Sequence, residues 1–146
     1  MRSLYPVLHV LSLVILIFGL TMLVPPAASW GLRDGAERAF DEAILLTLAV
    51  GALLGYVTRK SKRDLRIRDG FLMVALVWTV LPAFAAVPLI AQLDLSFTDA
   101  YFETVSGLTT TGATILTGLD ALPVSINFWR TQLVWLGGMG LIVLAV

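Results

Sequence analysis

The sequence contains no cysteine, one histidine and few charged residues. Without cysteine, disulfides, thiolate metal sites and cysteine nucleophiles are excluded. Charged residues make up only 14% of the chain, too few for the polar surface of an ordinary soluble domain. The net charge is zero and the one basic cluster lies between apolar segments, so nothing indicates nucleic acid binding. P-loop, HExxH and GxSxG motifs are also absent, and we expect no enzyme activity.

Hydrophobic residues, in contrast, make up 58% of the chain, and the mean hydropathy is +0.91. They form four stretches, each close to the roughly 20 residues that a helix needs to cross a bilayer. The first is longer than the apolar core of a secretory signal, so we expect a membrane helix there. The sequence predicts an all-α membrane protein with transmembrane helices over Leu4 to Val24, Phe40 to Val57, Phe71 to Leu93 and Phe128 to Val146.

The charges in the loops predict the orientation of these helices. The loop after the first stretch has an acidic bias, which fits the outer side of the membrane. The segment after the second stretch is basic, and by the positive-inside rule we expect it to be cytoplasmic. Its cations are Arg59, Lys60, Lys62, Arg63, Arg66 and Arg68. The third helix then runs outward, and residues 94–127 begin and end on the outer face.

Residues 94–127 are too few for a domain, yet they follow a pattern. Thr98 to Leu108 can form about three helical turns, with Ser96 or Thr98 as N-cap. We expect the helix to end at or soon after Gly107, because three β-branched threonines and a glycine follow. The sequence thus predicts a re-entrant helix, too short to cross the membrane, followed by an extended strand.

This order of elements suits a monovalent cation. A helix that enters from outside directs the negative end of its dipole to the middle of the membrane. An extended strand offers carbonyl oxygens that can replace a hydration shell. No acidic residue occurs between Thr104 and Leu119, so a carboxylate ring is not expected. The alternative is an exposed loop rich in threonine and glycine, which would not need the apolar surface of the short helix.

Two runs, FETVSGLTTTGATILTGLD and WRTQLVWLGGMG, resemble the first pore loop and the following helix of the Trk, Ktr and HKT superfamily of potassium transporters. The resemblance covers roughly Phe71 to Val146, and the two preceding helices fit the N-terminal pair of TrkH-type members. It implies that 1–69 form a two-helix unit with a cytoplasmic basic loop. Residues 70–146 would form the first of four helix, pore-loop, helix repeats around a pseudo-fourfold pore, so we expect the chain to be a fragment.

Carried onto this sequence, the resemblance assigns filter residues and partners. The filter would consist of Thr109, Thr110, Thr111, Gly112 and Ala113, with K⁺ at Thr110, Thr111 and Gly112. It implies K⁺ as the transported ion, no other cofactor, and a multi-pass protein of the bacterial inner membrane. It also implies a homodimer with a cytosolic nucleotide-binding regulatory subunit. The alternatives are one subunit of a homotetrameric cation channel and a non-conducting membrane scaffold.

The fourth helix carries further candidates. Arg130 lies near its outer end, where an unpaired charge is costly unless it snorkels or finds a partner. We hypothesise a contact with Glu103 on the pore helix that braces the filter. Three glycines, Gly137, Gly138 and Gly140, predict close packing behind the filter. We expect Trp129, like Trp30, at the outer interface.

Overall fold

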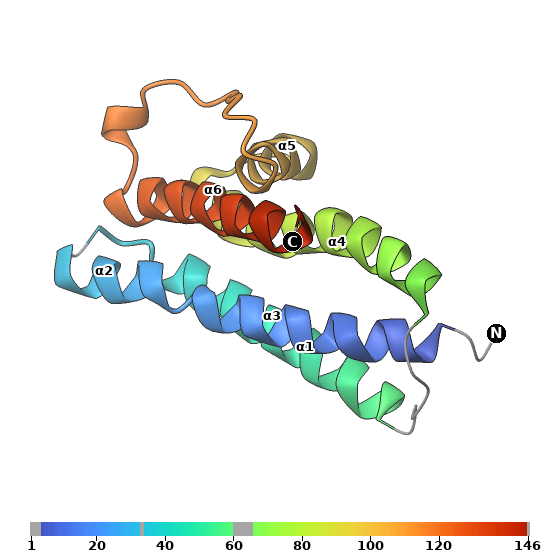
Figure 1. Ribbon diagram of the computed structural model, residues 1–146. Coiled ribbons are helices and arrows are strands. Elements are labelled where there is room, and N and C mark those ends of the chain that lie inside the picture. The colour runs from blue at the N-terminus through green and yellow to red at the C-terminus, as the bar shows by residue number, and fades with distance from the viewer. Residues whose placement is uncertain (1–3, 33, 60–65, 146) are drawn as a thin grey trace.

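The computed structural model describes residues 4–32, 34–59 and 66–145 (Figure 1). Within these ranges the protein consists of helices joined by loops, and no β-strand is present. The predicted all-α class is therefore confirmed for the part of the chain described. In the basic loop, Lys60, Lys62 and Arg63 lie outside the described residues, so the cytoplasmic placement of that loop stays a prediction.

The first four helices are α1 (Tyr5–Thr21), α2 (Val24–Leu32), α3 (Glu37–Thr58) and α4 (Ile67–Leu93). By length and composition, three segments are able to cross a membrane: Tyr5–Gly31, Glu37–Thr58 and Arg68–Leu93. They correspond to the first three predicted stretches and make the chain a multi-pass membrane protein. The helix resumes after a turn at Met22 and Leu23, because prolines in the first turn of α2 give up no internal hydrogen bond.

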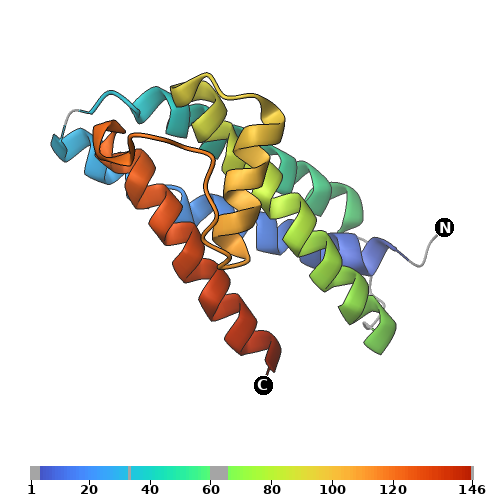
Figure 2. The same cartoon turned by 90° about the horizontal axis from the view of Figure 1, so that it is seen from above.

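The second part of the chain contains α5 (Phe97–Leu108), the short 3₁₀ helix η1 (Leu119–Ala121) and α6 (Val124–Ala145). Ser96 is the N-cap of α5, since its hydroxyl accepts a 3.1 Å hydrogen bond from the Asp99 amide. Figure 2 shows α5 between α4 and α6. It starts near the C-terminal end of α4 and stops partway, and the loop then returns along it to the start of α6.

Side chains of α5 and α6 donate hydrogen bonds to backbone carbonyls of α4 near its two internal prolines, Pro82 and Pro88. The Thr104 hydroxyl donates to the Pro82 carbonyl at 2.8 Å, and the Trp129 indole donates to the Ala85 carbonyl at 3.1 Å. Such bonds satisfy polar groups that cannot form hydrogen bonds to water inside a membrane. They hold α5 and α6 at a defined place on α4.

Trp129 is fully buried, so its ring packs inside this chain and does not face a membrane interface. Its ring lies 5.8 Å from that of Phe18 and 6.2 Å from that of Phe40, centroid to centroid. Trp30, in contrast, is 69% exposed. The difference arises because the N-terminal helices cover this side of α6, which a reading of helix depth alone does not reveal.

Candidate pore-loop site

The end of α5 is closed by a turn in which the backbone folds back on the helix. The Thr110 amide donates to the Gly107 carbonyl at 2.9 Å, and the Thr111 amide donates to the Ser106 carbonyl at 2.9 Å. Thr110 has a φ of 57°, in the left-handed region. These two bonds and the left-handed residue form a Schellman cap, which normally uses glycine. A β-branched residue in this conformation is strained, and such strain is found mostly at functional sites.

This cap changes the predicted course of the filter. Thr109 and Thr110 form the turn that caps α5, and the irregular segment beyond this turn begins at Thr111 and continues to Gly118. The predicted end of the helix at or soon after Gly107 is confirmed, while Thr109 and Thr110 form a turn where an extended strand was expected. The reason is that the last helical carbonyls take up the first available amides, which overrides the β preference of threonine.

The hydrogen bonds also orient the carbonyl groups. Amides of Thr110, Thr111 and Gly112 point back to α5, the last through a 3.4 Å bond to the Ser106 carbonyl. In a trans peptide the C=O of the preceding residue points the opposite way, and the described residues contain no cis peptide. The carbonyls of Thr109, Thr110 and Thr111 therefore point away from α5.

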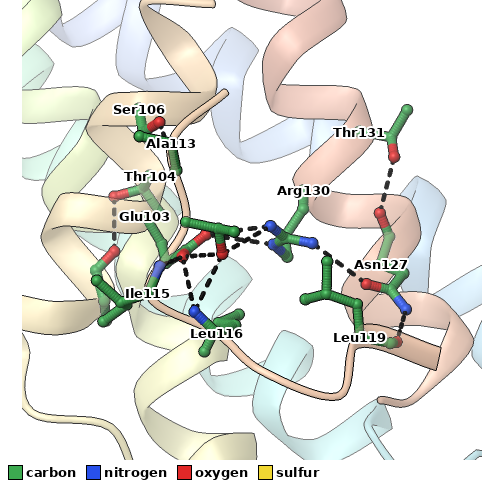
Figure 3. Close-up of polar contacts among 12 residues, drawn as sticks. Glu103, Thr104, Ser106, Ala113, Ile115, Leu116, Leu119, Asn127, Arg130 and Thr131 are labelled. Atoms are coloured by element: carbon green, nitrogen blue, oxygen red, sulfur yellow. Dashed lines mark hydrogen bonds and ion pairs between the residues drawn. The ribbon is translucent and has the colours of Figure 1, made fainter. Parts of the chain in front are cut away.

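Ala113, the last predicted filter residue, is arranged differently. Its carbonyl accepts a 2.6 Å hydrogen bond from the Ser106 hydroxyl and so points back toward α5 (Figure 3). Sequence reasoning missed Ser106, since a serine on a helix gives no sign of which distant carbonyl it reaches. The carbonyls of residues 109–111 thus point away from α5, whereas the carbonyl of Ala113 points toward it.

Beyond Ala113 the loop is held by the buried carboxylate of Glu103, which is 5% exposed (Figure 3). One carboxylate oxygen accepts the Thr114 hydroxyl and, at 2.7 Å, the Ile115 amide. A third, longer bond of 3.4 Å comes from the Leu116 amide. A single side chain of α5 therefore anchors three successive residues of the returning loop.

The other oxygen of Glu103 faces Arg130 on α6, as Figure 3 shows. The Nε and Nη2 atoms of Arg130 both lie 3.3 Å from Oε2 of Glu103, and Nη2 also lies 3.2 Å from the Thr114 hydroxyl. The structure thus brings together the two residues paired in the sequence hypothesis. Asn127, one turn earlier on α6, accepts from Arg130 at 3.4 Å and donates to the Leu119 carbonyl at 2.7 Å.

Gly137 is the point of closest approach between α6 and the end of α5. A Cβ atom built on Gly137 would lie 1.9 Å from the carbonyl oxygen of Leu108, a backbone atom that has no flexible side chain to move aside. On Gly138 the nearest atom would be a Thr110 methyl at 4.0 Å. Close packing behind the predicted filter therefore depends on Gly137.

Gly137→Ala is expected to separate α5 from α6 and to destabilise the protein by about 1–3 kcal/mol, the range for overpacking a well-packed site. Gly138→Ala is the matched control, since the same methyl group meets only an ordinary contact on the same helix. Thermal unfolding of the purified protein in detergent measures both. Equal melting temperatures for the two variants would contradict the close contact.

The end of α5 lies deep along α6. Gly137 is the fourteenth residue of α6, so at 1.5 Å per residue its contact with Leu108 lies about 20 Å from the start of that helix. Residues 109–115 are exposed on the surface of this chain. A non-helical, exposed stretch of backbone thus lies well inside the depth of the helix bundle.

Comparison with known proteins identifies sequences and a crystal structure that are similar to this chain. The chain is 49% identical over 140 residues to the Trk system potassium uptake protein TrkH of Escherichia coli strain K12, which covers 94% of this chain and 29% of that protein. The protein of the same name from Halomonas elongata is 49% identical over 146 residues, covering 99% and 30%. The chain therefore spans less than a third of the length of these relatives.

The crystal structure of the potassium transporter TrkH from Vibrio parahaemolyticus matches with a TM-score of 0.91 and 44% sequence identity. The match covers 98% of this chain and 31% of that one. The family model for TrkH, described as a cation transport protein, matches residues 36–146, which include α5, the returning loop and α6. Since that match extends over well more than half of the sequence, the chain belongs to the TrkH family.

Proposed function

We propose that this chain supplies one quarter of the pore of a potassium uptake transporter in the bacterial plasma membrane. In this proposal α6 is the fourth membrane crossing, α5 is the pore helix, and the backbone of Thr109 to Ala113, from the capping turn onward, forms one quarter of the selectivity filter. K⁺ contacts carbonyl oxygens of Thr110, Thr111 and Gly112. The carbonyl of Ala113, held by Ser106, anchors the outer end of the strand.

The observation that carries the proposal is the exposed non-helical backbone of residues 109–115 at the depth of the bundle. Lipid cannot satisfy free carbonyl groups, so such backbone occurs only where it is buried in protein or lines a water-filled path. Carbonyls that point away from α5 suit such a path, because they can replace the hydration shell of K⁺. The names of the relatives, all potassium uptake proteins, support the same ion.

The division of the chain follows from this role. Residues 1–69 form an N-terminal two-helix unit with a cytoplasmic basic loop, in which α1 with α2 is one membrane crossing and α3 is the other, and 70–146 form a helix, pore-loop, helix repeat. A single strand cannot surround an ion, so the other strands come from further repeats of the same transporter. The whole transporter works as a homodimer with a cytosolic nucleotide-binding regulatory subunit. The homotetrameric channel and the scaffold gain no support, because the relatives compared are named uptake proteins of roughly three times this length.

Complementation tests this function. A bacterium that lacks its potassium uptake systems is expected to grow at low K⁺ when it expresses the full-length gene that encodes this segment. Rb⁺ uptake into the same cells should be inhibited by K⁺ much more than by Na⁺, because the carbonyl filter is matched to the larger ions. No growth, despite protein present in the membrane, would contradict the proposal.

A further inference from the structure

One face of α6 is held by the N-terminal helices. The Ser125 amide, in the first turn of α6, donates a 2.8 Å hydrogen bond to Oδ2 of Asp34 in the loop between α2 and α3. Trp129 packs between Phe18 and Phe40. The Gln132 side-chain amide donates to the Thr21 carbonyl of α1 at 2.8 Å. The three α6 residues are spaced four and three apart, so they lie on one side of the helix.

Another face of α6 holds the pore loop. Arg130 binds Glu103, and Gly137 lies against the carbonyl of Leu108. In Figure 1, α5 lies on one side of α6, while α1, α2 and α3 lie on the other. The position of α6 therefore depends on the N-terminal unit, and the position of the pore loop depends on α6.

Asp34 is the polar centre of the N-terminal contacts. Besides the Ser125 amide, its carboxylate accepts the hydroxyl of the buried Ser29 and, at 3.3 Å, the Ala36 amide. Partial burial raises the pKa of Asp34, but the hydrogen bonds from Ser29, Ser125 and Ala36 outweigh it and leave that pKa below its usual value. The group stays ionised at neutral pH, where a negative charge at the start of α6 also suits the helix dipole.

We propose that Asp34 is a positioning residue for the selectivity filter: together with the N-terminal helices it holds α6 where that helix braces the pore loop. The two-helix unit, which contributes no strand to the filter, thereby contributes to ion discrimination. This inference rests on the proposed function, since it takes the pore loop to be the filter. Asp34 acts through α6 and has no contact with the transported ion.

The test uses the full-length transporter in liposomes and measures uptake of Rb⁺ and Na⁺ separately. Asp34→Ala removes all three acceptor bonds and is expected to lower the Rb⁺ to Na⁺ uptake ratio roughly three- to tenfold, the usual size of coupling through packed elements. Asp34→Asn keeps one acceptor oxygen and should lie between Asp34→Ala and the wild type. Glu42→Ala is the control, because it removes an exposed carboxylate from the nearby first turns of α3.

A second variant covers the case in which Asp34→Ala fails to fold. Gln132→Met keeps the side-chain volume and removes the hydrogen bond to α1, so the uptake ratio should fall in the same direction. An unchanged ratio in folded Asp34→Ala, or in Gln132→Met where the former does not fold, would overturn the inference. An equal fall in Glu42→Ala would also overturn it. If the wild type itself fails to take up Rb⁺, the proposed function fails instead, so the two failures are distinguishable.

Discussion

Glu103→Gln is expected to destabilise the protein by about 3 kcal/mol, the low end of the range for removing one partner of a buried ion pair. The glutamine has one acceptor oxygen where the carboxylate has two, so either Arg130 or the loop amides lose their partner. Where Arg130 loses its partner, it becomes a cation without a carboxylate, although its side chain is only 22% exposed. Chemical unfolding in detergent measures the loss, and Rb⁺ uptake by the full-length transporter should fall with it.

Asp120→Asn is the matched control, because Asp120 is an exposed carboxylate of the same loop. The exchange Glu103→Arg with Arg130→Glu tests the pair further. The sequence hypothesis alone predicts full rescue, since the two charges are simply swapped. The structure predicts partial rescue, because an arginine at 103 has no oxygen to accept the Thr114 hydroxyl and the Ile115 amide. Full rescue would show that the backbone bonds to Glu103 contribute little.

Gly112→Ser is expected to reduce Rb⁺ uptake by about tenfold or more, since every 1.4 kcal/mol of barrier changes a rate tenfold. Gly112 has a φ of 75°, and a residue with a Cβ atom in this region costs roughly 1–2 kcal/mol. Apart from Gly112 itself and its two chain neighbours, no atom of the described chain lies within 4 Å of a Cβ at this position, so the effect arises from the backbone and not from a clash within this segment. Relief of the strain would rotate the carbonyls that we propose as ligands.

Gly118→Ser separates backbone strain from filter function. Gly118 has a φ of 65° and an equally open surrounding, but it lies beyond the proposed filter in the same loop. Its substitution should lower the melting temperature about as much as Gly112→Ser does and leave the Rb⁺ to Na⁺ uptake ratio unchanged. If both variants lose ion discrimination equally, the assignment of Gly112 to the filter is wrong.

Local patterns in the sequence predicted much of this architecture. The long apolar runs located the membrane helices, because a bilayer core sets a minimum helix length. Ser96 was one of two predicted caps, since its hydroxyl only has to reach an amide three residues ahead. The pairing of Glu103 with Arg130 followed from the cost of isolated charges in a membrane. Each of these depends on neighbours in sequence or on a general property of the solvent.

Other features depend on contacts that no local pattern encodes. Asp34 reaches the Ser125 amide across 91 residues, and Glu103 binds backbone amides of the returning loop. Backbone donors look identical in every residue, so the sequence gives no indication of which one a carboxylate will find. The same holds for Thr110, whose left-handed conformation contradicts its own preference and is imposed by the cap of α5.

The sequence by itself therefore determined that this protein is a bundle of membrane helices with a short helix and a threonine-rich loop between the last two long ones. Hydrophobic length and helix-breaking residues act locally, and they suffice for that result. Only the tertiary structure decided which carbonyls point away from α5, where the loop is anchored, and that α6 links the N-terminal helices to the pore loop. These depend on hydrogen-bond geometry and on the close approach at Gly137, which arise only when distant segments pack together.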